Sequence, residues 1–386
     1  MKSQPVSPLI LSALLIFSVH SNPTLAMSRK ARLGQALFSD TNLSSPAGQA
    51  CASCHAPDHF FTDPDKSDPT SEGVIQDRYG SRNTPTLMYT SASPTFHFDK
   101  GEGLFIGGQF DDGRAPTTRD QAKQPFLQPL EMNNPTATAV VEKVRDASYA
   151  GLFRRVYGHD ALNEPAKAYD HIADAIAAFE KTEAFEPMTS KYDYYLAGRT
   201  QFTAQERRGR EIYEDDHKGN CAACHPSRPE NNGEKRPLFT DFSYDNLGIP
   251  RNPSNSFYIQ APEFNPLGFD FVDIGLGDHV KDVAENGKFK VPTLRNIAKT
   301  APYMHNGYFS TLRGVIDFYS TRDLKPACNS KWVSEEAALR QGCWPTPEVS
   351  RNVNHDELGK LGLSEQEVED LVAFLHTLTD GYQPNR

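Results

Sequence analysis

Two copies of the pattern Cys-x-x-Cys-His constrain this chain more than any other feature. The stretch "CASCH" occupies residues 51–55, and "CAACH" occupies residues 221–225. Two thiols at this spacing can form thioether bonds to the two vinyl groups of one haem, and the adjacent histidine then lies under the iron as its proximal ligand. A redox-active dithiol needs no histidine after its second cysteine, and a zinc site needs a second pair of ligands close by. The chain is therefore expected to hold two covalent c-type haems, through Cys51, Cys54 and His55 and through Cys221, Cys224 and His225.

The order of the segments indicates one domain around each motif. Residues 27–185 hold the first motif, a Pro/Gly-rich stretch and a helical pattern that starts at Asp170. Residues 186–386 begin with a linker, followed by a helical pattern at 203–216 that leads into the second motif. A last helical pattern, 364–378, starts with Ser-x-x-Glu, which is typical of a capping box. Few segments alternate like strands, so we expect a mainly α fold of two cytochrome c-like helical domains with long loops, each holding one haem.

The N-terminus has the pattern of an export signal. Lys2 precedes the apolar run 9–19, and small residues follow up to Ala26. This arrangement predicts a secretory signal peptide over residues 1–26, cut near Ala26, and a periplasmic mature protein. The apolar run is too short to span a bilayer comfortably and no later run is long enough, so we expect no transmembrane segment after cleavage; an uncleaved anchor is the alternative.

Charge and the remaining cysteines narrow the class further. The 386 residues have a formal net charge of -10, which argues against a nucleic-acid partner. Cys328 and Cys343 lie in a polar, irregular insertion at 325–349. In an oxidising compartment this pair predicts a structural disulfide that closes the insertion.

Several long motifs, in the same order, make the chain resemble the bacterial di-haem cytochrome c peroxidase/MauG family. They are "RNTPTL" (82–87), "GGQFDDGRA" (107–115), "QAKQPFLQPLEM" (121–132), "FKVPTLRNIAKTAPYMHNGYFSTL" (289–312) and the C-terminal stretch 356–382. The resemblance implies a peroxidase in which the N-terminal haem reacts with H2O2 and the C-terminal haem handles electrons. His55 would then be proximal at the peroxidatic iron and His225 at the electron-transfer iron.

The resemblance also predicts an open coordination position at the peroxidatic iron. Many family members block that position with a distal histidine, but the matching residue here is Val74, which cannot ligate. His59 and His97 are nearby alternatives outside that motif. An iron open to peroxide without prior reduction is a property of MauG-like members.

The family pattern Q-A-x-x-P-x-x-x-P-x-E-M is present and carries over two catalytic roles. Glu131 would move the proton from the attacked oxygen of peroxide to the departing one, with a pKa raised by burial. Gln121 would orient the peroxide by hydrogen bonding. A departure lies upstream, where Asp111 replaces the tryptophan that family members carry between their haems, so an aromatic relay at this position is not expected.

A calcium site is also implied by the resemblance. The matching positions are the Asn83 side chain and the backbone carbonyls of Thr300 and Pro302. Hard oxygen ligands, completed by water, suit Ca²⁺. An asparagine before Thr-Pro can instead cap a turn.

The sixth ligand of the second iron is predicted to be Tyr319. Leu312, Val315, Ile316 and Tyr319 follow the helical spacing of one apolar face, and family members of the electron-accepting type place a methionine at the last of these positions. A thioether raises the haem potential, whereas a phenolate is a hard, anionic ligand that favours ferric and higher oxidation states. Met304 and His305 are the competing ligands.

These residues favour a periplasmic, MauG-like di-haem peroxidase, with an aromatic side chain of a partner protein as one possible reductant. The first alternative is a peroxidase that detoxifies H2O2 with a small cytochrome c or cupredoxin as electron donor. The second, of another class, is a di-haem electron carrier without catalysis.

Overall fold

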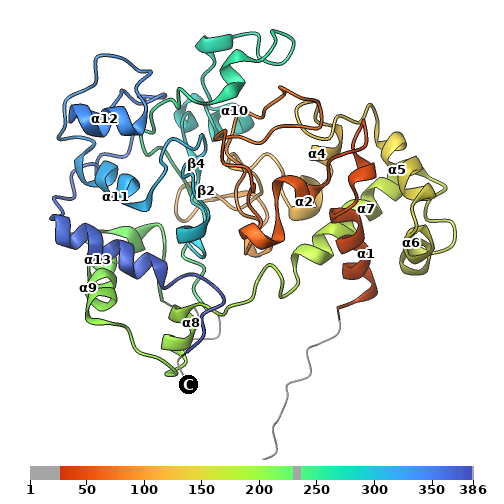
Figure 1. Ribbon diagram of the computed structural model, residues 1–386, viewed down its shortest axis with the longest axis horizontal. Coiled ribbons are helices and arrows are strands. Elements are labelled where there is room, and N and C mark those ends of the chain that lie inside the picture. The colour runs from red at the N-terminus through yellow and green to blue at the C-terminus, as the bar shows by residue number, and fades with distance from the viewer. Residues whose placement is uncertain (1–26, 229–235, 385–386) are drawn as a thin grey trace, which may run out of the picture.

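The computed structural model describes residues 27–228 and 236–384. This part of the chain is helical, with little sheet and long irregular connections (Figure 1). Among the described residues, no helix is both long enough and apolar enough to cross a membrane. The predicted signal peptide, residues 1–26, lies outside the described residues.

The elements follow the chain in this order. The N-terminal helices are α1 (Arg29–Phe38), α2 (Cys51–Cys54), α3 (Thr118–Gln121), α4 (Gln124–Leu127), α5 (Ala137–Asp146), α6 (Ala150–Tyr157) and α7 (Pro165–Glu180). The later helices are α8 (Lys191–Leu196), α9 (Ala204–Glu214), α10 (Leu276–Val280), α11 (Leu312–Thr321), α12 (Glu335–Gln341) and α13 (Glu365–His376). Strands β1 (His97–Asp99) and β2 (Leu104–Ile106) form one antiparallel pair, and β3 (Tyr244–Asp245) and β4 (Phe289–Lys290) form another.

The helices expected from periodicity are present. Thr203 and Ser364 each form a capping box that starts α9 and α13, in which the Ser or Thr hydroxyl accepts from the third helical N–H and a glutamate accepts in return. Helix α7 begins five residues before the periodic pattern, at Pro165, because proline at the first helical position has its φ already set and lacks only an N–H that the helix does not use. Helix α11 covers the whole predicted stripe from Leu312 to Tyr319.

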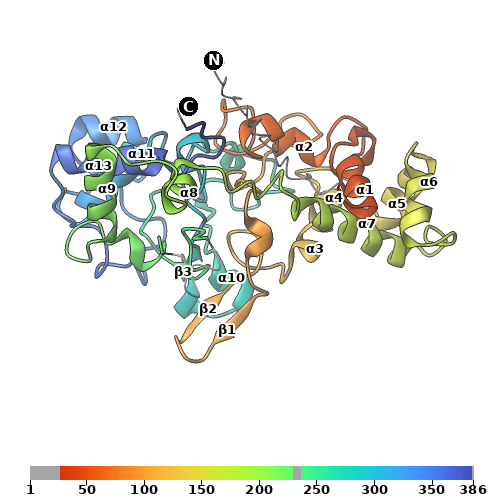
Figure 2. The ribbon, with the colours of Figure 1, turned by 90° about the horizontal axis from the view of Figure 1, so that it is seen from below.

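One helix crossing occurs twice in the molecule. In α1, a Cβ atom on Gly34 would lie 1.9 Å from the carbonyl oxygen of Ala175 in α7. In α9, a Cβ atom on Gly209 would lie 1.9 Å from the carbonyl oxygen of Asp370 in α13. Only glycine permits backbones to approach this closely. The two pairs stand at opposite ends of the molecule, with the β1–β2 hairpin projecting between them (Figure 2).

The apolar side chains collect in two clusters. One is built from buried residues between Leu33 and Phe185, and the other from buried residues between Tyr192 and Leu378. The predicted boundary between residues 27–185 and 186–386 falls between these two clusters. The domain division itself stays a prediction.

A half-buried arginine joins the two halves. The Nε and Nη2 atoms of Arg82 lie 2.6 and 2.8 Å from the carboxylate oxygens of Asp273, and its Nη1 lies 2.7 Å from Asp112. Near the C-terminus, Asp380 accepts hydrogen bonds from Tyr89 at 2.7 Å and from Asn296 at 2.8 Å. These contacts hold the two halves in one arrangement around the space between them.

The insertion at 325–349 packs onto the helix that carries Tyr319. Cys328 and Cys343 form a disulfide, and α12 lies inside the loop that it closes. The neighbouring Trp344 is 2% exposed and packs edge-on against Phe318, with 5.2 Å between ring centroids. The insertion therefore covers the outer side of α11 and supports its position.

Candidate active site

The two motif histidines have the same environment. Nδ1 of His55 lies 3.1 Å from the carbonyl oxygen of Phe61, and Nδ1 of His225 lies 2.8 Å from the carbonyl oxygen of Phe239. A carbonyl at Nδ1 keeps the proton there and leaves Nε2 as the free ligand atom, which is how proteins orient metal-binding imidazoles. Burial lowers the pKa of His55 to about 4 and also lowers the pKa of His225. Both rings are thus held neutral, as iron ligation requires.

A second repeat, which sequence analysis missed, orients both histidines. The tripeptide Pro-Thr-Leu occurs at 85–87 and at 292–294. Thr86 Oγ1 donates to the carbonyl of Phe60 at 2.6 Å, and Thr293 Oγ1 donates to the carbonyl of Leu238 at 2.6 Å. The amide of Leu87 donates to the carbonyl of Phe61, and the amide of Leu294 donates to the carbonyl of Phe239. These are the same carbonyls that accept from the two motif histidines. The copies of "PTL" that follow each haem-attachment motif were the signal that could have revealed this duplication.

The motif thiols are suited to covalent attachment rather than to thiolate chemistry. Burial raises the pKa of Cys51 and Cys54 to about 12, and burial does the same for Cys221 and Cys224. Zinc binding and dithiol redox chemistry both depend on the thiolate. Among the described residues, no group of three or more His, Cys, Asp and Glu side chains is placed to hold a metal ion, so the zinc alternative has no support.

A single cavity connects the two motifs. Its volume is about 940 Å³, and the Cys-x-x-Cys-His side chains of both motifs line it. The predicted site residues that also line it are Gln121, Glu131, Asn83, Asp111, Thr300, Pro302, Tyr319, Met304 and His305. The residues chosen from sequence for haem binding, peroxide chemistry and calcium binding therefore share one space.

Glu131 is the carboxyl group that fits proton transfer in this cavity. It follows α4 in an irregular turn, and burial raises its pKa to about 7 although Arg114 acts in the opposite direction. Among the described residues, no side-chain hydrogen-bond partner holds its carboxylate. Gln121 ends α3 and lines the same cavity. A carboxyl group that is half ionised near neutral pH can both accept and return a proton.

Val74 lies beside this carboxyl-bearing turn. Its amide donates to the carbonyl of Glu131 at 2.9 Å, and Gly73 lets the two segments approach, because a Cβ there would lie 2.4 Å from the carbonyl oxygen of Leu130. The alternative distal ligands lie elsewhere. His59 pairs with Asp58, and His97 is exposed in β1; neither histidine lines the cavity, and the Val74 side chain does not line it either.

Tyr319 reaches the cavity from α11 on the side of the second motif. Burial raises the pKa of its phenol, with Cys221 and Cys224 as the next contributors, so the phenol lies close to the second pair of thiols. Within the described residues its hydroxyl group has no hydrogen-bond partner.

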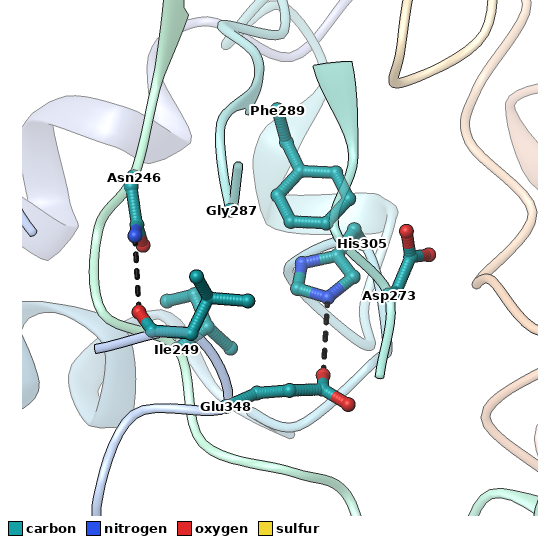
Figure 3. A pocket seen from close by; sticks show the side chains of 8 residues that line it. Asn246, Ile249, Asp273, Gly287, Phe289, His305 and Glu348 are labelled. Atoms are coloured by element: carbon teal, nitrogen blue, oxygen red, sulfur yellow. Dashed lines mark hydrogen bonds and ion pairs between the residues drawn. The ribbon is translucent and has the colours of Figure 1, made fainter. Parts of the chain in front are cut away.

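The competing side chains occupy different positions. Met304 lines the cavity with a backbone φ of 74°. The ring of His305 stacks on Phe289, with 3.6 Å between centroids, and its Nε2 faces Glu348 at 3.9 Å (Figure 3). His305 thus directs Nε2 at a carboxylate rather than at a motif.

Charged groups gather around Asp111 on the cavity wall. Asp111 lines the cavity, and burial raises its pKa. Lys290 lies beside it; burial lowers its pKa to about 8, and its Nζ donates to the carbonyl of Gly108 at 2.7 Å. Arg82 completes a half-buried group of mixed charge around this position.

The three predicted calcium ligands have free oxygens. Asn83 Nδ2 donates to the carbonyl of Pro69 at 2.9 Å, which leaves its Oδ1 toward other partners. Within the described residues, the carbonyl oxygens of Thr300 and Pro302 accept no hydrogen bond. All three residues line the cavity. This oxygen set has the chemistry that Ca²⁺ prefers.

Comparison with known proteins agrees with this geometry. Residues 28–201 match the family model described as di-haem cytochrome c peroxidase. The chain is 42% identical to the methylamine utilization protein MauG of Paracoccus denitrificans, over 92% of this chain and 89% of that one. It belongs to the di-haem cytochrome c peroxidase family. The chain is also 30% identical to the cytochrome-c peroxidase IdrP2 of Denitromonas iodatirespirans, over 90% of this chain and 80% of that one.

A solved relative shares the fold. The di-haem peroxidase BthA of Burkholderia thailandensis superposes with a TM-score of 0.75 and 31% identity, over 91% of this chain and 86% of that one. The chain is therefore a di-haem peroxidase, an enzyme that uses two haem groups. The alternative of a di-haem electron carrier without catalysis is rejected, because the family and the named relatives are peroxidases.

One buried acid in this peroxidase was missed by sequence analysis. Glu180, at the end of α7, is 3% exposed and lines the cavity close to Cys51. Burial raises its pKa to about 8. In the sequence it follows Ile176 by four residues and Ile172 by eight, so it falls on the buried face of α7, and this helical spacing was the signal that could have found it.

Proposed function

We propose that H2O2 reacts at the N-terminal haem, held by Cys51, Cys54 and His55, and that electrons reach it through the C-terminal haem. The observation that carries this proposal is Glu131, a half-buried carboxyl group on the wall of the cavity that both motifs line, whose pKa is raised to about 7 by desolvation. Val74 stands where many family members have a distal histidine that blocks the iron. Because valine cannot bind iron, this residue supports an iron that is open to peroxide. A haem held by these residues would supply the electrons for cleavage of the O–O bond.

The protein side chains supply the protons and the orientation. Reduction of H2O2 to two water molecules consumes two electrons and two protons. The Glu131 carboxylate accepts the proton of the attacked peroxide oxygen and returns it to the departing oxygen, so that water leaves rather than hydroxide. The Gln121 amide donates a hydrogen bond that orients the peroxide. Neither group needs to move far, because α3 and the turn after α4 both end at the cavity.

We propose that Tyr319 and His225 would hold the iron of the C-terminal haem. A phenolate favours oxidised iron, which suits storage of oxidising equivalents better than rapid reduction by a small cytochrome. The identity of 42% to a protein named MauG supports a MauG-like enzyme whose reductant is an aromatic side chain of a partner protein. Relatives named cytochrome c peroxidase, at 29–30% identity, support the alternative of a cytochrome c or cupredoxin donor.

Optical and EPR spectroscopy of the Tyr319→Phe holoprotein tests this ligand. We expect the low-spin ferric signal of the second haem to change, while the signal of the first haem stays. Tyr303→Phe is the matched control, because Tyr303 lines the same cavity but donates its hydroxyl hydrogen to the carbonyl of Ile297 at 3.0 Å. An unchanged Tyr319→Phe spectrum, or a thioether-to-iron band in the wild type, would reject the phenolate and favour Met304.

We propose a Ca²⁺ ion on Asn83 Oδ1 and the carbonyls of Thr300 and Pro302. The three unengaged oxygens support it. Elemental analysis of the purified holoprotein is expected to find one calcium per chain, and none in Asn83→Leu. A full calcium content in Asn83→Leu would contradict this ligand set.

We propose that residues 1–26 are removed on export and that the enzyme acts in the periplasm. The oxidised pair Cys328–Cys343 supports an oxidising compartment. The intact mass of the exported protein is expected to equal residues 27–386 plus two haems. A mass that includes residues 1–26 would support an uncleaved anchor.

A further inference from the structure

The cavity reaches the surface between the two halves of the chain. Gln128 and Pro129, directly after α4, are exposed and line the cavity from the N-terminal half. Glu263, which lies between the short 3₁₀ turns Ser256–Ile259 and Gly268–Asp270, is exposed and lines it from the C-terminal half. A residue that both faces solvent and lines a cavity marks an opening. The segment that carries Glu263 lies at the top of the molecule in teal, above α10 (Figure 1).

Phe264 stands in this opening. It is half-buried and lines the cavity, and its ring lies under the guanidinium group of Arg78, with 4.4 Å from Cζ to the ring centroid. The same guanidinium group donates through Nη1 to the carbonyl of Pro129 at 3.3 Å. Arg78 therefore links the ring of the C-terminal half to the N-terminal rim of the opening.

The segment around Phe264 is fixed rather than free. Asn265 is 3% exposed, and its Nδ2 donates to the carbonyls of Phe257 at 2.9 Å and Gly268 at 3.0 Å. Gln260 Nε2 donates to the carbonyl of Asp77 at 3.0 Å, next to Arg78. The position of the Phe264 ring is therefore determined from both sides of the opening.

The opening leads directly to the proton-transferring carboxyl group. Glu131 follows Pro129 by one intervening residue, Leu130, and all three line the cavity. A phenyl ring donates no proton and binds no iron, so its effect at this point is steric. A ring held at an entrance admits a small polar molecule and obstructs one that carries a bulky substituent.

We propose that Phe264 is the specificity-determining side chain that admits H2O2 to the peroxide pocket and excludes bulky organic hydroperoxides, with Arg78 as its positioning residue. This inference rests on the proposed function, in which peroxide reacts at the N-terminal haem. It also makes the C-terminal half a part of the peroxide pocket of the N-terminal haem.

The test compares two probes of different size on the di-haem holoprotein with Phe264→Ala. In stopped-flow spectroscopy we expect the rate constant for cumene hydroperoxide, relative to that for H2O2, to rise about tenfold or more. In optical titration of the ferric protein we expect 4-phenylimidazole to bind about tenfold more tightly, with cyanide affinity unchanged. Ligand binding reports access to the iron independently of turnover.

The chain offers a matched control in Phe269→Ala. Phe269 lies on the same segment but is 56% exposed and does not line the cavity. Its removal is therefore expected to change neither the ratio of the two peroxide rate constants nor the ratio of the 4-phenylimidazole and cyanide affinities. Arg78→Leu, which frees the ring without removing it, is expected to shift both ratios in the same direction by a smaller factor. Equal ratios in wild type and Phe264→Ala, or an equal shift in Phe269→Ala, would overturn the proposal.

The experiments distinguish an error in the role of Phe264 from an error in the proposed function. If Glu131→Gln leaves the H2O2 rate unchanged, the assignment of the peroxide pocket is wrong. If Glu131→Gln slows that rate but Phe264→Ala leaves the size selectivity unchanged, only the role assigned to Phe264 is wrong.

Discussion

Gly209 in α9 approaches Asp370 in α13 so closely that a Cβ atom on the glycine would lie 1.9 Å from the aspartate carbonyl oxygen. Alanine at this position must push the two helices apart, and overpacking of this kind costs about 1–3 kcal/mol. We therefore expect Gly209→Ala to lower the thermal unfolding midpoint of the holoprotein. Differential scanning calorimetry measures this change.

The control for this prediction is a helical glycine with space around it. A Cβ on Gly151 in α6 would meet its nearest atom at 3.6 Å. Gly151→Ala is expected to leave stability unchanged or to raise it by about 0.5–1 kcal/mol, because alanine is the better helix former. Equal destabilisation by both substitutions would show that the close helix contact is not the cause.

Glu131→Gln is expected to slow the reaction with H2O2 by about 10²–10⁴-fold, because it removes the base that transfers the proton. Single-turnover stopped-flow spectroscopy measures the rate. Glu142→Gln, at an exposed position in α5, is the matched control and is expected to react like the wild type. A wild-type rate in Glu131→Gln would remove the carboxylate from the mechanism.

The same carboxyl group predicts a pH dependence. Because burial raises the pKa of Glu131 to about 7, the reactive carboxylate form increases as pH rises through 7, and the wild-type rate should rise with it until it levels off. The sign for stability is opposite: the folded state holds this proton more tightly, so stability falls as pH rises from the ordinary value of 4.5 to about 7. Glu131→Gln should show a flat rate profile and unfold no earlier than the wild type at pH 8.

Asp273→Asn is expected to destabilise the protein by about 3 kcal/mol at pH 7, because it leaves the half-buried Arg82 without its main partner. Burial acts to raise the pKa of Asp273, but Arg82 outweighs it and holds that pKa well below the ordinary 3.8. A lowered aspartate pKa stabilises the fold above the ordinary value and loses this effect as pH falls below it. Thermal unfolding should therefore show a gap between wild type and variant that is full at pH 7 and shrinks below pH 4.

An exposed ion pair provides the comparison. Asp278 pairs with Lys281, and both side chains are more than 70% exposed. Asp278→Asn is expected to have little effect at any pH, since exposed pairs contribute little. A gap that persists unchanged for Asp273→Asn at low pH would show that the carboxylate charge is not responsible.

Asp111→Trp is expected to speed the equilibration of oxidising equivalents between the haems, because it places an aromatic ring in the cavity between the two motifs. Rapid-mixing EPR after H2O2 addition measures the time course at each haem. Asp111→Leu removes the same charge beside Lys290 without adding an aromatic ring, so it serves as the control. Equal acceleration in both variants would assign the effect to charge rather than to the ring.

Much of the site was predictable because its chemistry is local. Haem attachment needs two thiols and a histidine within five consecutive residues, so the motifs at 51–55 and 221–225 are visible in the chain itself. The capping boxes at Thr203 and Ser364 are equally local, and the structure has both. Gln121 and Glu131 came from resemblance alone, since neither residue type nor spacing marks a buried acid.

The remaining features depend on segments that are far apart in the chain. Periodicity indicates that α7, α9 and α13 are helices, but not that Gly34 meets Ala175 or that Gly209 meets Asp370. Such crossings are decided by which faces pack together. The duplicated hydrogen bonds of the two Pro-Thr-Leu segments likewise appear only when each lies against its own motif.

What the sequence by itself determined is the covalent chemistry: two haem-attachment motifs, the helices that flank them and a family resemblance strong enough to assign a di-haem peroxidase. Only the tertiary structure decided that both motifs open into one cavity, that Arg82 joins the halves through Asp273, and that Phe264 lies beneath Arg78 at the entrance. The physical reason is burial. The pKa of Glu131 and the position of the Phe264 ring depend on which distant segments exclude water around them, and no local pattern in the chain records that.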